Sequence, residues 1–241
     1  MRTVSLAAPL ALVLAGVLSF LGGCGDATPA PGADDSLDRV KKAGVLKWGA
    51  DPSGGAPFVF TDPANPDRII GFEIDIMEKV AGHLGVKHEV VKSQWDTLPA
   101  NLLAGRSDMV MNGLEINDER RKAVAFSEPY YVYEQQLTVR AADKDRYTSL
   151  SDLKGRKVGT LSGAEANNVL AAAGFAEDLI VPHDDSLTPY RNLELERVDA
   201  VLQEDVIDAH YAAPDKMPKL VNQPKTFAAG KYAVAVRPAD I

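Results

Sequence analysis

Cysteine and histidine are scarce in this chain. The sequence holds one cysteine, Cys24, which excludes an internal disulfide and a four-cysteine metal site. Its four histidines stand singly, without an HExxH motif or any other spacing typical of metal ligands. We therefore predict no metal and no cofactor.

Basic residues are also in deficit. Lysine and arginine number 26 against 34 aspartates and glutamates, so the net charge is -8 at pH 7. Proteins that bind nucleic acid concentrate lysine and arginine, so we expect no nucleic-acid partner. With 46% hydrophobic and 25% charged residues, the composition is that of a globular protein. Its length permits one large domain or two smaller lobes.

The N-terminal residues 1–23 have the features of a signal peptide. Arg2 precedes an apolar stretch, which ends in Leu21-Gly22-Gly23-Cys24. These last four residues resemble a bacterial lipobox, and the resemblance implies a lipoprotein anchored to a membrane by a lipid on Cys24. The alternative is a plain transmembrane anchor, because about 20 apolar residues can span a bilayer. Both interpretations place the remainder in the periplasm or at another extracytoplasmic face.

A flexible tether is predicted to follow at residues 24–37. Its composition of small and polar residues with prolines offers almost nothing to bury. The folded part is expected to start near residue 38.

Two series of alternating strand and helix patterns follow the tether. In the first, we predict strands at 45–49, 88–91 and 109–111 and helices at 72–84 and 98–103. In the second, we predict strands at 157–160, 179–181 and 198–202 and helices at 150–153, 164–173, 187–196 and 206–211. This order predicts mainly parallel α/β sheets, whose binding sites lie beyond the carboxyl ends of the strands.

The two series predict two lobes joined by two crossings. An extended segment at 134–140 separates the series, and a loop at 222–230 precedes a last strand at 232–236. We expect lobe 1 to comprise 38–133 plus 231–241, and lobe 2 to comprise 137–228. The crossings at 134–136 and 229–230 would then form the hinge of a clamp.

A set of short motifs occurs in one order between residues 40 and 237. The motifs are Gly49-Ala50-Asp51, Ala56-Pro57-Phe58, Gly71-Phe72-Glu73-Ile74-Asp75, Trp95-Asp96, Gly105-Arg106-Ser107-Asp108, Glu119-Arg120, Phe126-Ser127-Glu128-Pro129-Tyr130-Tyr131, Asp152-Leu153-Lys154-Gly155, Val158-Gly159 and Val198-Asp199-Ala200. This ordered set resembles the periplasmic amino-acid-binding proteins of ABC importers, the family of lysine/arginine/ornithine-, histidine- and glutamine-binding proteins. The resemblance implies a type II two-lobed clamp, an amino-acid ligand and an ABC permease as partner. Segments 54–57 and 112–116 are similar to members in which the binding part is fused to a permease.

A clamp that closes on an amino acid must pair both of its charges, because an unpaired buried charge costs several kcal/mol. By resemblance, Arg120 receives the carboxylate through its planar fork. The alternative is a surface arginine that pairs with Glu119 or an aspartate. The ammonium is expected at Glu204, where relatives carry an aspartate, with neighbouring Asp205 as the alternative.

The resemblance also places further residues at the ligand. Backbone groups of Asn112, Gly113 and Glu115 are expected to line lobe 1, with Glu115 standing where many relatives have serine or threonine. In lobe 2, Ser162 and Glu165 lie at a predicted strand-to-helix turn, whose free N–H groups can receive a carboxylate. The alternative for Glu165 is a role in capping its helix.

Trp95 matches an aromatic residue that packs on the ligand's side chain, whereas Gly55 stands where some relatives have the opposite aromatic wall. Asp51 matches a residue that meets cationic side chains, or it supports its loop. The acidic residues Asp51, Glu115 and Glu204 exceed what one ammonium requires. We therefore expect a polar amino acid as ligand, with arginine or lysine binding more tightly than glutamate. Glutamine stays an alternative, because Asp51 and Glu115 can accept hydrogen bonds from an amide.

Other functions fit the same fold. A ligand-sensing module of a receptor would need a downstream signalling region, and a cell-wall lyase would need a further catalytic domain. A dehydratase would use Glu204 or Glu115 as a proton donor. The sequence shows no Ser-His-Asp or Cys-His arrangement, so we predict a binding protein rather than an enzyme. The chain stops at Ile241, where relatives continue with helices that complete lobe 1, so we expect a truncated or divided protein.

Overall fold

The computed structural model describes residues 35–240. The predicted signal peptide, Cys24 and nearly all of the predicted tether lie outside the described residues. The end of that tether was wrongly placed, because Ser36 and Leu37 belong to helix α1 (Ser36–Ala43). This helix buries Val40 in the core and ends at Gly44 in the left-handed conformation. Within 35–240, no helix is long and apolar enough to cross a membrane.

The first lobe is built on a five-stranded sheet in the order β4-β1-β5-β12-β6. Strand β1 (Val45–Ala50) pairs in parallel with β4 (Lys87–Lys92) and β5 (Met109–Val110). Strand β12 (Ala235–Val236) returns from the second lobe and pairs antiparallel with β5 and β6 (Ala125–Phe126). The sheet is therefore mixed, because a strand from the end of the chain enters it in the opposite direction.

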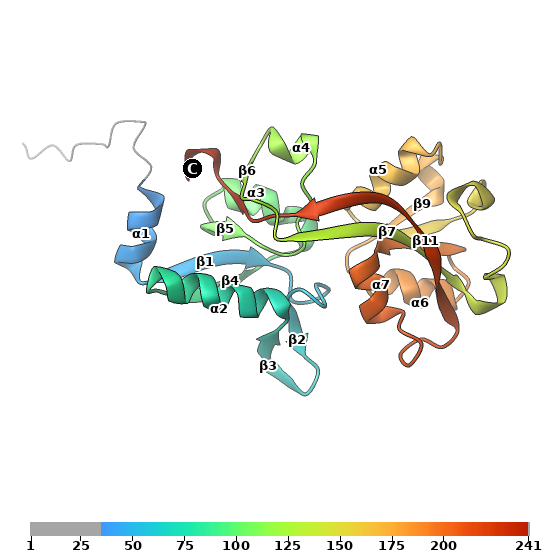
Figure 1. Cartoon of the computed structure of the whole chain (residues 1–241), viewed down its shortest axis with the longest axis horizontal. Coiled ribbons are helices and arrows are strands. Elements are labelled where there is room, and N and C mark those ends of the chain that lie inside the picture. The colour runs from blue at the N-terminus through green and yellow to red at the C-terminus, as the bar shows by residue number, and fades with distance from the viewer. Residues whose placement is uncertain (1–34, 241) are drawn as a thin grey trace, which may run out of the picture. The chain divides into compact units, whose positions relative to one another are not determined.

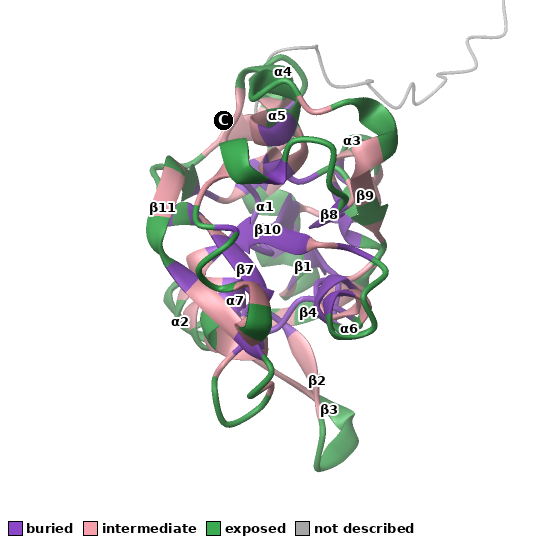
Figure 2. Ribbon diagram, turned by 90° about the vertical axis from the view of Figure 1, so that its right-hand side faces the viewer, coloured by how far each residue is buried: buried purple, intermediate pink, exposed green. Residues whose placement is uncertain are grey.

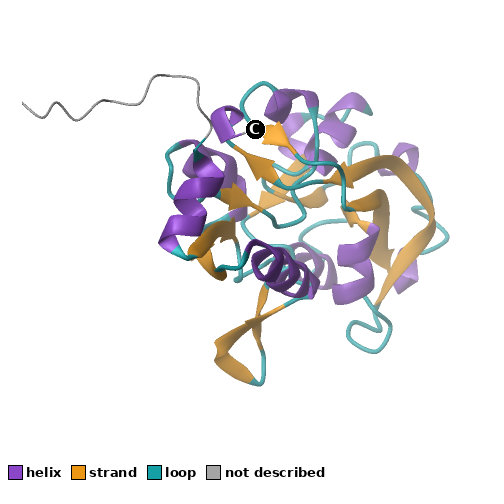
Figure 3. Ribbon diagram, turned by 60° about the vertical axis from the view of Figure 1, so that its left-hand side comes forward, coloured by secondary structure: helices purple, strands orange, loops and turns teal. Residues whose placement is uncertain are grey.

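The helices of the first lobe follow the apolar spacing in the sequence. Helix α2 (Phe72–Leu84) buries Met77 and Ala81 and ends at Gly85, whose φ of 72° is left-handed. The other helices are α3 (Leu98–Leu103) and the short α4 (Asp118–Arg121). A hairpin of β2 (Phe60–Asp62) and β3 (Asn65–Ile70), which the sequence pattern did not predict, projects from this lobe (Figure 3).

The second lobe holds another five-stranded sheet, in the order β11-β7-β10-β8-β9. Its strands β10 (Ala200–Glu204), β8 (Val158–Leu161) and β9 (Ile180–His183), the last at the edge, run parallel to one another. Helices α5 (Glu165–Ala172), α6 (Thr188–Glu194) and α7 (Asp205–Tyr211) pack against them. All five residues of β10 are buried, which Figure 2 shows at the centre of this lobe.

Two long strands connect the lobes (Figure 1). Strand β7 (Tyr131–Arg140) runs into the second sheet, and β11 (Leu220–Tyr232) runs back beside it in antiparallel pairing. The predicted loop at 222–230 is wrong, because those residues belong to β11. Pairing with β7 keeps them extended, with register shifts between Asn222 and Thr226 and between Thr226 and Ala229. The predicted crossings at 134–136 and 229–230 lie within these strands, and their hinge role stays a prediction.

Short 3-10 turns complete the described part of the chain: η1 (Trp95–Thr97), η2 (Ala141–Asp143), η3 (Leu150–Leu153), η4 (Glu177–Leu179) and η5 (Pro238–Asp240). The cores of the two lobes touch. Leu161 and Ala164, which both precede α5, are in the same apolar cluster as Trp95 and Leu98 of the first lobe. This contact places the end of β8 against η1 and α3.

Candidate functional site

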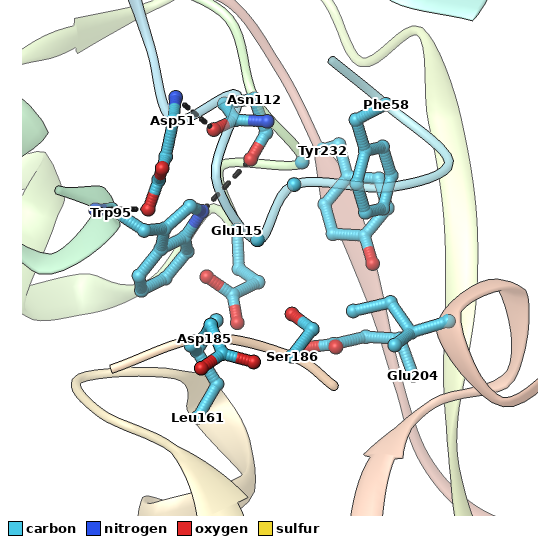
Figure 4. A pocket seen from close by; sticks show the side chains of 14 residues that line it. Asp51, Phe58, Trp95, Asn112, Glu115, Leu161, Asp185, Ser186, Glu204 and Tyr232 are labelled. Atoms are coloured by element: carbon cyan, nitrogen blue, oxygen red, sulfur yellow. Dashed lines mark hydrogen bonds between the residues drawn. The ribbon is translucent and has the colours of Figure 1, made fainter. Parts of the chain in front are cut away.

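A small cavity lies where the two lobes meet, and residues beyond strand ends line it (Figure 4). Its volume of about 20 Å³ is comparable with the space that one water molecule needs. Asp51, Trp95 and Asn112 lie on one side of it, Asp185, Ser186 and Glu204 on the other, and Glu115 projects between them. The remaining lining residues are Gly54, Gly55, Phe58, Gly113, Leu161, Ile207 and Tyr232.

Asp51 follows β1, and its carboxylate accepts hydrogen bonds from the surrounding backbone. Its Oδ1 accepts the N–H of Ser53 at 2.9 Å and also bonds the Ser53 hydroxyl, while its Oδ2 accepts the N–H of Trp95 at 3.2 Å. The N–H of Asp51 donates to Oδ1 of Asn112 at 2.8 Å. This geometry supports the loop-stabilising alternative for Asp51 more than direct contact with a ligand.

Trp95 is fixed by two contacts within the first lobe. Its indole N–H donates to the carbonyl of Asn112 at 2.8 Å, and the guanidinium of Arg120 lies 4.9 Å from the centre of its ring. A cation at this distance is attracted to the face of the ring. The predicted aromatic wall therefore also serves as a platform for Arg120.

Arg120 belongs to α4, and its side chain contacts both lobes. The Asn117 side chain caps that helix by accepting the N–H of Arg120 at 2.8 Å. The Arg120 Nη1 donates to the carbonyl oxygen of Glu115 at 2.8 Å and to its Oε2 at 2.5 Å. Its Nη2 donates to the carbonyl oxygen of Gly163, in the second lobe, at 3.0 Å. Arg120 is thus not a free surface residue, and its acidic partner is Glu115 rather than Glu119, which was considered as the alternative.

Glu165 contributes its backbone to the same place. As the first residue of α5, it has a free N–H, which donates to Oε1 of Glu115 at 3.0 Å. Its carboxylate points elsewhere and accepts from Asn117 at 3.3 Å and from Asn168 at 3.0 Å. A guanidinium and a helix N-terminal N–H therefore converge on one carboxylate.

Glu204 ends β10 and is fully buried beside the cavity. Burial raises its pKa well above the ordinary value, and the nearby charge of Glu115 raises it further. The Gln135 side chain donates to Glu204 Oε1 at 3.3 Å, which acts in the opposite direction. Its neighbour Asp205 is turned away and accepts the N–H of Glu134 at 3.3 Å. Glu204 is thus the member of the pair that faces the cavity.

The remaining predicted residues divide into two groups. Gly113 lines the cavity, and its N–H donates to Glu73 at 2.8 Å. Ser162 is half-buried and does not line the cavity; its N–H donates to the carbonyl of His183 at 2.8 Å. Sequence reasoning missed Asp185 and Ser186, although both follow strand β9 and so lie where binding sites of such sheets are expected.

Phe58 and Tyr232 also line the cavity and were not predicted. Their rings meet edge to face with centres 5.4 Å apart. Only the return of β11 to the first lobe brings them together, so no local sequence signal marks them. Among residues 35–240, no group of three or more His, Cys, Asp or Glu side chains is placed to hold a metal ion.

Comparison with known proteins agrees with this architecture. The family model of bacterial extracellular solute-binding proteins, family 3, matches residues 46–228. The L-cystine-binding protein TcyJ of Escherichia coli K12 is 33% identical over 171 residues, which are 70% of this chain and 63% of the relative. The probable histidine-binding protein of Neisseria gonorrhoeae is 30% identical over 227 residues, 92% of this chain and 80% of that protein.

A solved structure gives the same result for the fold. The arginine-bound form of truncated ArgBP from T. maritima superposes with a TM-score of 0.74 and 30% identity, covering 84% of this chain and 92% of that one. The predicted two-lobed α/β fold and the predicted family are thereby confirmed. This chain, which spans just under two thirds of the length of its cystine-binding relative, belongs to the bacterial extracellular solute-binding proteins, family 3.

Proposed function

We propose that the chain is the extracytoplasmic solute-binding component of an ABC importer and that it captures a cationic amino acid for a membrane permease. The observation that carries this proposal is the convergence of the Arg120 guanidinium and the Glu165 N–H at the junction of the lobes, beside the cavity lined by Glu204. The first two groups suit a carboxylate, and the acidic one suits an ammonium.

The character of the cavity supports a cation as ligand. Asp51, Glu115, Asp185 and Glu204 line it, and no lysine or arginine is among its lining residues. Carboxyl groups gathered in this way favour a positive ligand, because like charges at short range repel one another until a cation joins them. The cystine-, histidine- and arginine-binding names of the relatives support an amino acid.

Binding rather than catalysis is part of this proposal. Glu204 lines the cavity and has a pKa that burial raises, but its described partners are Gln135 and Glu115 rather than a nucleophile. Attachment through a lipid on Cys24 is also proposed, from the four residues 21–24. Labelled fatty acid should enter the protein in a bacterial host and be lost in Cys24→Ala. Unlabelled mature wild-type protein would contradict the attachment.

A thermal-shift screen of the amino acids tests the ligand class. A ligand at a hundredfold its dissociation constant should add about 2.7 kcal/mol of stability. We expect L-arginine or L-lysine to raise the unfolding midpoint more than L-glutamate or L-aspartate. A larger shift with an acidic amino acid would refute the cationic preference, and no shift with any amino acid would refute the proposed function.

Two substitutions test the role of Arg120. Arg120→Lys keeps a positive charge beside Glu115 but loses the planar fork, so calorimetry should show arginine binding weakened about tenfold or more. Arg120→Ala should abolish binding, because a ligand carboxylate would be left without its partner. Circular dichroism checks that both variants are folded. Near-normal affinity in the alanine variant would exclude Arg120 as the carboxylate partner.

A further inference from the structure

The carboxylate held by Arg120 and the start of α5 belongs to the protein itself. Glu115 Oε2 lies 2.5 Å from Arg120 Nη1, and Oε1 lies 3.0 Å from the N–H of Glu165. We call these two donors, the Arg120 guanidinium and the Glu165 N–H, the carboxylate seat. The side chain of Glu115 is 1% exposed and projects from the first lobe to the second lobe's helix.

The two donors of the carboxylate seat cannot hold a second carboxylate while Glu115 occupies them. The cavity beside Glu115 has a volume of about 20 Å³, far less than an amino acid occupies. Two carboxylates on the same guanidinium and N–H would also repel each other at short range. Glu204 already places a second acidic group beside Glu115. A further carboxylate in the seat therefore requires that Glu115 leave it.

We propose that Glu115 is an internal competitor that occupies the seat and must be displaced before a ligand's carboxylate binds there. This inference rests on the proposed function for the identity of the ligand, but the seat itself can be tested without one. Only molecules in which Glu115 has left the seat can bind a ligand's carboxylate there. The apparent affinity for such a ligand therefore falls in proportion to the fraction of molecules whose seat is empty. Cationic ligands without a carboxylate are not subject to that competition. Glu115 is thus a specificity-determining residue, because it reduces the difference in affinity between amino acids and the corresponding amines without a carboxylate.

The first experiment asks whether an added carboxylate enters the seat after Glu115 is removed. Unfolding midpoints are measured in sodium acetate and in sodium chloride of equal ionic strength. Acetate should raise the midpoint of Glu115→Ala by about 2 to 4 °C relative to chloride. It should change neither the wild type, whose seat is filled, nor the double variant Glu115→Ala/Arg120→Ala, whose seat has lost its guanidinium. Glu115→Ser serves in place of the alanine variant if that chain does not fold.

The second experiment compares L-arginine with agmatine, the corresponding guanidino amine without the carboxylate. The ratio of the agmatine Kd to the arginine Kd should rise at least about tenfold from wild type to Glu115→Ala. Glu119→Gln is the matched control, because it removes an exposed negative charge next to Arg120 in α4 and leaves both donors of the seat in place. Its ratio should stay within about threefold of wild type, which separates competition from a general change in charge.

The outcomes distinguish the two proposals. Failure of acetate to stabilise the Glu115 variant, or equal stabilisation of the wild type, overturns the internal competitor. An equal rise of the ratio in Glu119→Gln overturns it as well. If neither arginine nor agmatine binds any variant, the cationic ligand class is wrong, while the acetate measurement still decides the role of Glu115.

Discussion

Glu73 holds the loop that presents Asn112, Gly113 and Glu115 to the cavity. It is fully buried at the start of α2, and its Oε1 accepts the N–H of Gly113 at 2.8 Å and the hydroxyl of Tyr130. Gly113 has a φ of 58°, and a Cβ there would lie 2.9 Å from the ring of Phe58. The loop is therefore fixed by a glycine conformation and by one buried carboxyl group.

This carboxyl group predicts a specific dependence of stability on pH. Burial raises the pKa of Glu73 to about 7, against the lowering effect of its bonds from Tyr130 and Gly113. Its protonated form is favoured by folding, so its contribution is fully present below about pH 4.5 and is lost as the pH rises through 7. Between pH 4.5 and 8.5, wild type should lose about 3 kcal/mol of unfolding free energy relative to Glu73→Gln.

Denaturant unfolding of both proteins across that pH range measures this difference. Glu204 and Asp208, whose pKa values burial also raises, are present in both proteins and cancel in the comparison. Parallel curves for the two proteins would show that Glu73 titrates alike in the folded and unfolded chains.

The resemblance, rather than position along the chain alone, predicted much of the candidate site. Arg120, Glu115 and Glu204 are predicted on resemblance, and the structure brings Glu115 into contact with Arg120 and close to Glu204. Their ligand-binding roles stay predictions. The bond between Glu115 and Arg120 was not foreseen, since a side chain's choice between ligand and neighbour depends on distances that spacing along the chain does not fix.

At the scale of elements, apolar periodicity located α2 and β1 well but failed for β11. The 222–230 segment contains Pro224 and polar residues, which are typical of a loop. Its extended conformation comes from antiparallel pairing with β7, a contact between distant parts of the sequence. Tertiary pairing thus overrides the local preference of the segment.

A pair of glycine substitutions tests which elements tolerate change. A Cβ on Gly230 of β11 would lie 2.2 Å from the Tyr133 ring, which cannot retreat because it stacks on Tyr232 at 4.5 Å. A Cβ on Gly82 of α2 would meet nothing within 4 Å. Gly230→Ala should therefore destabilise the protein by about 1–3 kcal/mol, whereas Gly82→Ala should stabilise it by up to about 1 kcal/mol.

Denaturant unfolding of the two variants and the wild type measures both changes in stability. Equal midpoints for the two variants would mean that the crossing strands adjust freely to an added methyl group. A stabilising Gly230→Ala would contradict the close packing of β11 against Tyr133.

At the scale of the whole folded unit, few polar contacts hold the lobes together at the site. The Arg120 side chain bonds the Gly163 carbonyl, Glu115 bonds the Glu165 N–H, and Asn117 reaches the Glu165 carboxylate. Hydrogen bonds of this kind can be exchanged for bonds to water at modest net cost. The pairing of β7 with β11 does not involve these contacts, so we expect a separation of the lobes to leave both sheets intact.

Gly54 offers a way to obstruct closure without touching the carboxylate seat. It lies in the loop after β1, and a Cβ there would be 2.6 Å from the Cβ and 3.0 Å from the Cα of Asp185 in the second lobe. Asp185 is held in place because its Oδ1 accepts the N–H groups of Leu187 and Thr188, each at 2.8 Å. In Gly54→Ala, one lobe must therefore move away from the other.

We expect arginine binding to weaken about tenfold or more in calorimetry. The radius of gyration with saturating arginine should exceed that of wild type. Gly82→Ala is the matched control, with the same change far from the contact. Unchanged affinity in Gly54→Ala would show that the lobes need not approach this closely to bind their ligand.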